Sequence, residues 1–428
     1  MSHPNGPRTG RPPTYAPHGV VATPHHLASA AGLNILQSGG SAVDAAIAAN
    51  AVLCVVYPHM AGLGGDGFWL IAEPGTGRVH GINASGPAAR GATLDYYRPR
   101  SKDNEIPARG PLSILTVPGA IDGWRLAHER FGRLPWNKLF DAAIGYAGEG
   151  MAVSRSLADW LVQDEPILTS YPATAAIYLP NRRVPRDGER LVQGDLAGSF
   201  QQIANSGARK SFYEGPIAER ICSALQPQGS PLTVDDFAAF HAEWVEPIKA
   251  TYRGYEVYEL PPNTQGFTAL QILNLIEGYA VTGWGDGTAD YYHHMAEAVK
   301  VAFADREEWL TDPKFVNIPV ERLISKEYAD ERRRLIDSER ALDIANVPAG
   351  IAYTHPHERR PPDGDTCYFC AADRDGMVVS LIQSIYHDFG SAVTVVPPGS
   401  SCKTGAPSLR STKRIPIICS RASAHSIR

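Results

Sequence analysis

The segment Asp363–Gly390, DGDTCYFCAADRDGMVVSLIQSIYHDFG, decides how the rest of the chain is interpreted. Two β-prone runs flank the residues DRDG at 373–376, a pattern that predicts a hairpin. The first run opens with Thr366. A threonine hydroxyl is a poor nucleophile, but cleavage between Asp365 and Thr366 would supply a free α-amino group with a pKa of about 7.7–8.0 as its base. The segment therefore predicts a hairpin that carries an N-terminal threonine nucleophile.

This hairpin resembles the start of the small subunit in the γ-glutamyltransferase family, N-terminal-nucleophile enzymes made as one chain that cuts itself before the catalytic threonine. The resemblance covers about residues 19–395, and an ordinary hairpin with a surface threonine is the alternative interpretation. The matching residues of the hairpin are Thr366-Cys367, Ala371-Ala372-Asp373, Gly376, Val378-Val379-Ser380 and Phe389-Gly390.

The resemblance implies a four-layer α/β/β/α sandwich, whereas the pattern of residues alone predicts only a mixed α and β chain. It also implies a division of the chain. Residues 19–365 would form the large-subunit region and residues 366–395 the start of the small subunit. Residues 1–18 are expected to be a disordered N-terminus, and residues 396–428 an aberrant, disordered tail.

Further site residues follow from the resemblance. Ser384 aligns with a second hydroxyl residue, which would orient and polarise the Thr366 hydroxyl. The arginine that grips the substrate α-carboxylate in γ-glutamyl enzymes aligns with Ser85, and its glutamate neighbour aligns with Gly86. Arg90 lies nearby in the sequence. It would either replace the missing carboxylate-binding arginine or be an ordinary surface arginine.

The position of the family's asparagine, which binds the substrate α-amino group, holds Tyr386, followed by His387. This form of the strand end resembles the branch that includes oxamate amidohydrolase and cephalosporin-acylase-like proteins. Ser85, Arg90, Tyr386 and His387 are therefore the candidate substrate-binding residues, and poor activity on glutathione is expected because both zwitterion contacts are altered.

Composition limits the class of protein. The chain has 428 residues, of which 43% are hydrophobic and 20% charged, so it can bury a large core. A net charge of −5 argues against nucleic acid as a partner. Residues 1–18 lack the apolar core of a secretory signal, and the longest apolar stretch, Ala45–Tyr57, is too short to span a bilayer. The sequence thus favours a cytoplasmic protein without a membrane partner.

Two motifs are set aside. Residues 62–67, GLGGDG, satisfy the G-x-G-x-x-G pattern, but a helix is predicted before them and a strand after them, the reverse of a dinucleotide site. Cys367 and Cys370 form a C-x-x-C on a predicted strand, where they would point to opposite faces. No cofactor and no metal site are therefore predicted.

Several helices are predicted from their start and stop signals. Thr23 is expected to cap a helix that runs to Gln37, and Ser41 with Asp44 to cap a buried second helix. A capping box is also expected at Thr233–Asp236. Further helices are predicted at about 268–279 and 289–310, and the second of these carries Tyr292, Met295, Val299 and Phe303 as an apolar stripe.

The end of the chain departs from the family. Residues 391–428 contain no Asp, Glu, Phe, Trp or Tyr, although the whole chain holds 45 acidic residues. In a shifted reading frame, codons compatible with Ser401–Leu409 can encode LQNRGAFF, which resembles the family sequence after the Phe-Gly strand. A frameshift near Val396 would remove several central strands and the backbone donors of the family's oxyanion hole, and would impair catalysis. A genuine, disordered tail is the alternative.

The sequence thus predicts a self-cleaving amidohydrolase or acyltransferase in which Thr366 attacks a small-molecule amide and passes the acyl group to water or an amine. Its large and small subunits would come from one precursor, and a homo-oligomer is possible. A true γ-glutamyl transferase or glutathione hydrolase is one alternative. A truncated family member that binds ligand without turnover is the other.

Overall fold

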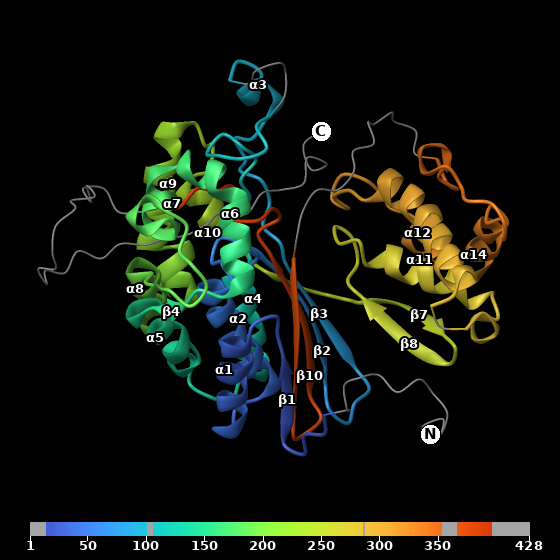
Figure 1. Cartoon of the computed structure of the whole chain (residues 1–428), viewed down its shortest axis with the longest axis horizontal. Coiled ribbons are helices and arrows are strands. Elements are labelled where there is room, and N and C mark those ends of the chain that lie inside the picture. The colour runs from blue at the N-terminus through green and yellow to red at the C-terminus, as the bar shows by residue number, and fades with distance from the viewer. Residues whose placement is uncertain (1–13, 101–105, 286, 353–365, 396–428) are drawn as a thin grey trace, which may run out of the picture.

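The computed structural model describes residues 14–100, 106–285, 287–352 and 366–395, which form two lobes (Figure 1). The first lobe holds a six-stranded sheet and its helices, and the second holds a small hairpin with its own helices. Asp365 and the tail at 396–428, with the expected frameshift, lie outside the described residues. Of the N-terminus, only residues 14–18 are described.

The sheet of the first lobe brings the two ends of the described chain together. Its strand order is β1-β9-β10-β2-β3-β6, and every neighbouring pair is antiparallel. The hairpin near the C-terminus is therefore inserted between strands from the first hundred residues. The strands are β1 (Gly19–Ala22), β2 (Asp66–Ala72), β3 (Val79–Ala84), β6 (Glu243–Val245), β9 (Cys367–Asp373) and β10 (Val378–Ser384).

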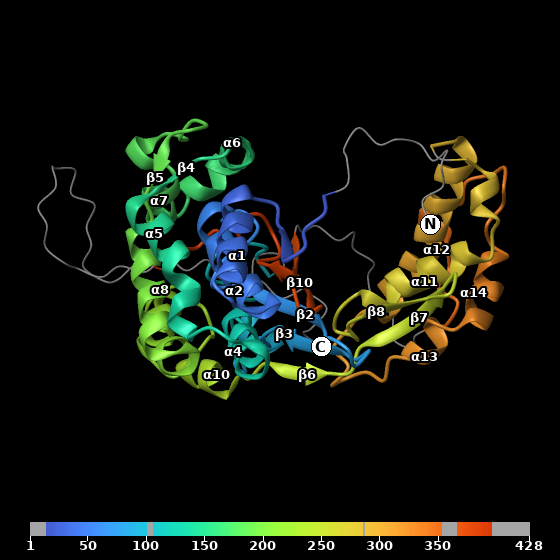
Figure 2. The same cartoon turned by 90° about the horizontal axis from the view of Figure 1, so that it is seen from below.

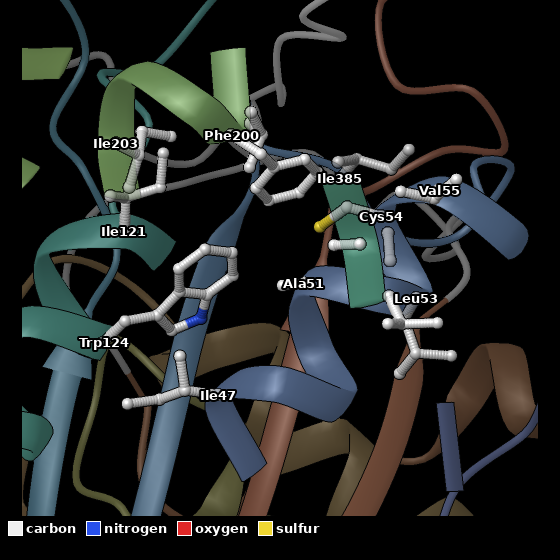
Figure 3. Packing of buried hydrophobic residues seen from close by; sticks show 14 of the residues in the cluster. Ile47, Ala51, Leu53, Cys54, Val55, Ile121, Trp124, Phe200, Ile203 and Ile385 are labelled. Atoms are coloured by element: carbon white, nitrogen blue, oxygen red, sulfur yellow. The ribbon is translucent and has the colours of Figure 1, made fainter. Parts of the chain in front are cut away.

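Helices cover one face of this sheet, with α1, α2 and α4 lying directly against it (Figures 1 and 2). All residues of α2 are buried, as its Ala- and Val-rich sequence predicts. Its side chains pack against Trp124, Phe200 and Ile385 in the main core (Figure 3). The helices of this lobe are α1 (His26–Gln37), α2 (Ala42–Val56), α3 (Leu94–Tyr97), α4 (Ala120–Phe131), α5 (Asp141–Glu149), α6 (Arg155–Thr169), α7 (Pro172–Tyr178), α8 (Gly194–Ser206), α9 (Pro216–Leu225) and α10 (Val234–Ala239).

The opposite face of the sheet carries apolar side chains that are partly open to solvent, including Tyr368, Val378 and Ile382. Within the described residues, the first lobe thus supplies one helical layer and one sheet of the expected four-layer sandwich. A two-stranded sheet of β4 (Met151–Ala152) and β5 (Arg190–Leu191) lies among its helices.

The second lobe follows β6 along the chain and returns to the sheet at residues 260–263. The side chain of Asn263 contacts Asn83 and Ser85 at the end of β3. The elements of the second lobe are β7 (Ile248–Tyr252), β8 (Tyr255–Glu259), α11 (Gly266–Glu277), α12 (Ala289–Trp309), α13 (Val320–Leu323) and α14 (Lys326–Arg333).

The predicted N-terminal caps are confirmed for α2 and α10 and wrong for α1. Ser41 and Asp44 form the capping box of α2, and Thr233 with Asp236 forms that of α10. The cap of α1 is His25 rather than Thr23, because the His25 ring accepts the hydrogen bond from the N–H of Leu27. The Thr23 hydroxyl bonds instead to the carbonyl of His25.

The helix predicted at 289–310 is confirmed as α12, but its most buried side is not the apolar stripe. Tyr292 is 64% exposed, whereas the buried side of the helix carries His294, Glu297 and Val301. Polar groups can be buried there because they have partners: the Glu297 carboxylate accepts hydrogen bonds from Lys300 and from the N–H of Leu342. Tertiary hydrogen bonds thus override the hydrophobic pattern.

Candidate active site

The predicted hairpin is confirmed as β9 and β10. Its turn is closed by the carboxylate of Asp373, which accepts hydrogen bonds from the N–H groups of Asp375 and Met377, both at 3.0 Å. Gly376 has φ 91°, a left-handed conformation that favours glycine. The ladder extends to the pair Gln383–Cys367, so Thr366 stands immediately before the paired part of β9.

Two hydroxyl groups meet at the open end of this hairpin. The Thr366 hydroxyl donates to the Oγ atom of Ser384 at 3.1 Å. The N–H of Tyr386 donates to the same Oγ atom at 3.0 Å, and Tyr386 has φ 75°, which turns the chain back over Ser384. Thr366 itself is exposed. The two residues that the sequence singled out as nucleophile and partner are therefore in contact.

A buried polar network connects β10 to the helical layer. Gln383, which is fully buried, donates to the carbonyl of Gly62 at 2.8 Å and accepts from Asn50 of α2. The Oδ1 atom of Asn50 in turn accepts from the indole of Trp124 at 2.8 Å. Because Gln383 precedes Ser384, this network sets the position of the Ser384 hydroxyl relative to the helical layer. None of these three side chains was recognised from the sequence.

The segment after Ser384 is held by Arg109. Its guanidinium group pairs with the Asp388 carboxylate at 3.0 Å and donates to the carbonyl oxygens of Asp388 and Gly390. Burial, together with the nearby carboxylate of Asp388, raises the pKa of Asp164 to about 7. His387 is buried, with its ring edge-on to that of Tyr386 at 4.7 Å. Arg109 thus anchors the turn that carries Tyr386 and His387, two of the candidate substrate-binding residues.

Ser85 lies at the other side of the site, at the end of β3. Its hydroxyl donates to Asn83 Oδ1 at 2.7 Å and accepts from Asn263 at 3.0 Å. The neighbouring Gly86 packs so tightly that a Cβ atom there would lie 1.6 Å from the carbonyl oxygen of Val117. The backbone at this position therefore has no room for the glutamate expected from the family pattern.

Arg90 is engaged by acidic residues at the start of α10. Its guanidinium contacts the Asp236 carboxylate at 3.2 Å and the carbonyl oxygen of Asp235 at 3.0 Å, at the start of α10. The structure thus brings together Thr366, Ser384 and Tyr386, and it engages Arg90 with α10.

Cys367, next to Thr366, is a competing nucleophile only if its thiol ionises. Burial raises the pKa of Cys367 to about 12, so the thiol stays protonated at neutral pH. The alternation of β9 buries Cys367 and leaves Cys370 partly exposed on the other face, as expected for a strand. Across the described ranges, no cluster of three or more His, Cys, Asp and Glu side chains is placed to hold a metal ion.

A solved structure with a similar backbone identifies the class of fold. A cephalosporin acylase from Bacillus halodurans superposes with a TM-score of 0.80 at 38% identity, covering 92% of this chain and 71% of the acylase. The chain thus has the mixed α/β fold of the N-terminal-nucleophile hydrolases.

Sequence relatives agree with this class. The glutathione hydrolase-like YwrD proenzyme of Bacillus subtilis is 44% identical over 89% of this chain and 69% of its own length. The oxamate amidohydrolase proenzyme of Klebsiella pneumoniae is 38% identical over 89% of this chain and 70% of its own length.

The sequence model of gamma-glutamyltranspeptidase matches residues 28–400, and the chain belongs to this family of hydrolases and transferases. The expected resemblance is thereby confirmed. Among the helices that the structure describes, none has the length and apolar character needed to cross a membrane.

Proposed function

We propose that this protein is an amidohydrolase or acyltransferase whose chain cuts itself between residues 365 and 366. The Thr366 hydroxyl attacks the carbonyl of residue 365, and the acyl group shifts from the Thr366 nitrogen to its Oγ1 atom, which frees the α-amine. Water then hydrolyses this ester, so residue 365 ends in a carboxylate and Thr366 becomes the N-terminus. In the mature site the same hydroxyl attacks a small-molecule amide while the new α-amine takes its proton. The amine of the substrate leaves, and the acyl group on Thr366 Oγ1 passes to water or to an acceptor amine.

The contact of 3.1 Å between the hydroxyls of Thr366 and Ser384 carries this proposal. In the described geometry Ser384 Oγ accepts from Thr366, which places the threonine oxygen next to a fixed polar group. The relatives support the same proposal, because both are proenzymes and one of them is an amidohydrolase. We further propose that the protein acts in the cytoplasm.

Mass spectrometry of the acyl-enzyme tests the proposal directly. The protein is mixed with an activated acyl donor, quenched in acid and digested, and the peptide that begins at Thr366 is expected to gain the mass of the acyl group. An acyl group found on Cys370, or on no residue while the donor is consumed, would contradict the assignment of the nucleophile.

Replacing Ser384 with alanine is expected to slow amide turnover by about a hundredfold, a typical loss for one positioned polar group. The change removes the oxygen that meets both Thr366 and the N–H of Tyr386. Ser380→Ala is the matched control, since this serine lies on the same strand and bonds to Tyr368 instead. Initial rates measured with one amide should fall for Ser384→Ala alone; equal rates in both variants would remove Ser384 from the mechanism.

Glutathione is expected to be a poor substrate. Ser85 occupies the position of the family's carboxylate-binding arginine, and its hydroxyl is hydrogen-bonded to Asn83 and Asn263. Arg90 pairs with Asp236. A site without the partners for a zwitterion discriminates against it by orders of magnitude. Glutamate release from glutathione should therefore be at least about a hundredfold slower than hydrolysis of an amide without the α-amino-acid group. Equal values of kcat/KM would restore the γ-glutamyl alternative.

A further inference from the structure

Polar side chains form a row across four adjacent strands at one end of the sheet. Thr366 stands beside Ser384, and Ser384 is the register partner of Asp66 on β2. The next pair along β2 and β3 is Gly67 with Ala84, which places Ser85 beside Asp66. Directly opposed residues of an antiparallel pair share a face. Asp66 therefore lies on the face of the sheet that carries the two hydroxyls.

Asp66 lies in the GLGGDG stretch, which the sequence excludes as a dinucleotide site and which connects α2 to β2. That connection brings it to the site: a Cβ atom on Gly65 would lie 2.6 Å from the carbonyl oxygen of Ser384, so glycine is needed for the close approach. The Asp66 Oδ1 atom accepts from the N–H of Gly86 at 3.2 Å. The carboxyl group is thus held by the backbone next to Ser85.

Among the described residues, the carboxyl group of Asp66 interacts with backbone N–H groups and with a phenol. Burial raises the pKa of Asp66 to about 7. The hydrogen bonds from the N–H groups of Gly86 and Gly119 lower this pKa, but by less than burial raises it. The titratable group that interacts with Asp66 is the phenol of Tyr213, whose own pKa burial raises well above its usual value, so that it stays neutral. Within the described part of the chain, no Lys or Arg side chain forms an ion pair or hydrogen bond with Asp66.

We propose that Asp66 is a specificity-determining residue of this site, which binds an N–H donor at the distal end of the substrate and rejects a carboxylate there. The donor is a primary carboxamide. This inference rests on the proposed function, because it takes the Thr366 hydroxyl as the point of attack. It names a substrate class that the γ-glutamyl pattern does not supply.

Strand spacing sets the length of such a substrate. β10 lies between β9 and β2, so these two strands are separated by twice the distance between neighbouring strands. The backbones at Thr366 and Asp66 therefore lie about 10 Å apart. An attack distance of about 3 Å and a hydrogen bond of about 3 Å leave about 4 Å for the substrate chain. The scissile carbonyl and the distal donor are thus separated by about three or four carbon atoms.

Two isosteric ketones test this inference on the unaltered protein. 5-Oxohexanamide and 5-oxohexanoate differ only in a distal carboxamide or carboxylate, and a ketone replaces the scissile amide. Ligand-observed NMR measures the binding of both and reports whether either is consumed. At pH 8 we expect the carboxamide to bind at least about tenfold more tightly, because the ionised Asp66 repels the carboxylate.

The preference should shrink when the Asp66 charge is removed. It is expected to fall to about threefold or less at pH 5.5, where a carboxyl group with a pKa near 7 is protonated. Asp66→Asn should have the same effect at pH 8. Asp187→Asn removes an equal charge from an exposed loop and should leave the preference unchanged.

A preference that survives Asp66→Asn, equal binding of both ketones, or no binding of either would overturn the role of Asp66. These outcomes do not depend on catalysis. If acyl transfer to Thr366 fails while the binding preference is present and needs Asp66, the proposed function is wrong and the specificity inference stands.

Discussion

Replacing Thr366 with alanine is expected to leave the purified protein as one uncut chain with no measurable amidase activity. The variant lacks the oxygen that attacks in both self-cleavage and turnover, so both reactions are lost together. Turnover should fall by a factor of about 10⁴ or more, the usual effect of removing a nucleophile. A denaturing gel and a rate measurement on the same preparation check both parts.

Thr366→Ser is the matched control for this variant. Serine keeps a hydroxyl group that can reach Ser384 Oγ, so cleavage and turnover should continue at reduced rates. If the alanine variant hydrolyses amides at the rate of the unaltered protein, the nucleophile is another residue. If the serine variant is as inactive as the alanine variant, the methyl group of Thr366, and not its hydroxyl alone, is essential.

Trp124→Ala is expected to lower the free energy of unfolding by about 3–5 kcal/mol, the range for deleting a large buried aromatic side chain. Trp124 is fully buried in the main core, where it packs between the helices and the sheet (Figure 3). Its indole also donates to Asn50, which binds Gln383 of β10. Its loss should therefore also slow amide turnover. Urea unfolding followed by circular dichroism gives the change in free energy.

Tyr292→Ala provides the comparison for Trp124→Ala. Tyr292 is also an aromatic residue on a long helix, but it is 64% exposed. Its replacement should change the free energy of unfolding by no more than about 0.5 kcal/mol. Equal losses in the two variants would mean that burial of Trp124 does not account for its contribution to stability.

The site could be predicted from the sequence where its chemistry is local to one segment. The DRDG turn, the two β-prone runs and a threonine at the start of one of them determine the hairpin, and strand pairing then brings Ser384 to Thr366. Capping boxes such as Ser41–Asp44 could also be predicted from the sequence, because both partners lie within four residues of each other.

Contacts between distant segments could not be predicted. Nothing near Arg90 in the sequence indicates that Asp236 pairs with it, and the register between β2 and β10 is needed to place Asp66 beside Ser384. The His25 cap of α1 and the polar buried face of α12 fail for a related reason. In each case a hydrogen bond of the folded chain replaced the partner that the local pattern favoured.

Self-cleavage before Thr366 is tested by the intact mass of the purified protein, together with the N-terminal residue of its smaller fragment. Two polypeptides are expected, residues 1–365 and 366–428, with Thr366 as the first residue of the second, and one uncut chain is expected for Thr366→Ala. A single chain of 428 residues from the unaltered protein, or the same cut in Thr366→Ala, would contradict this expectation.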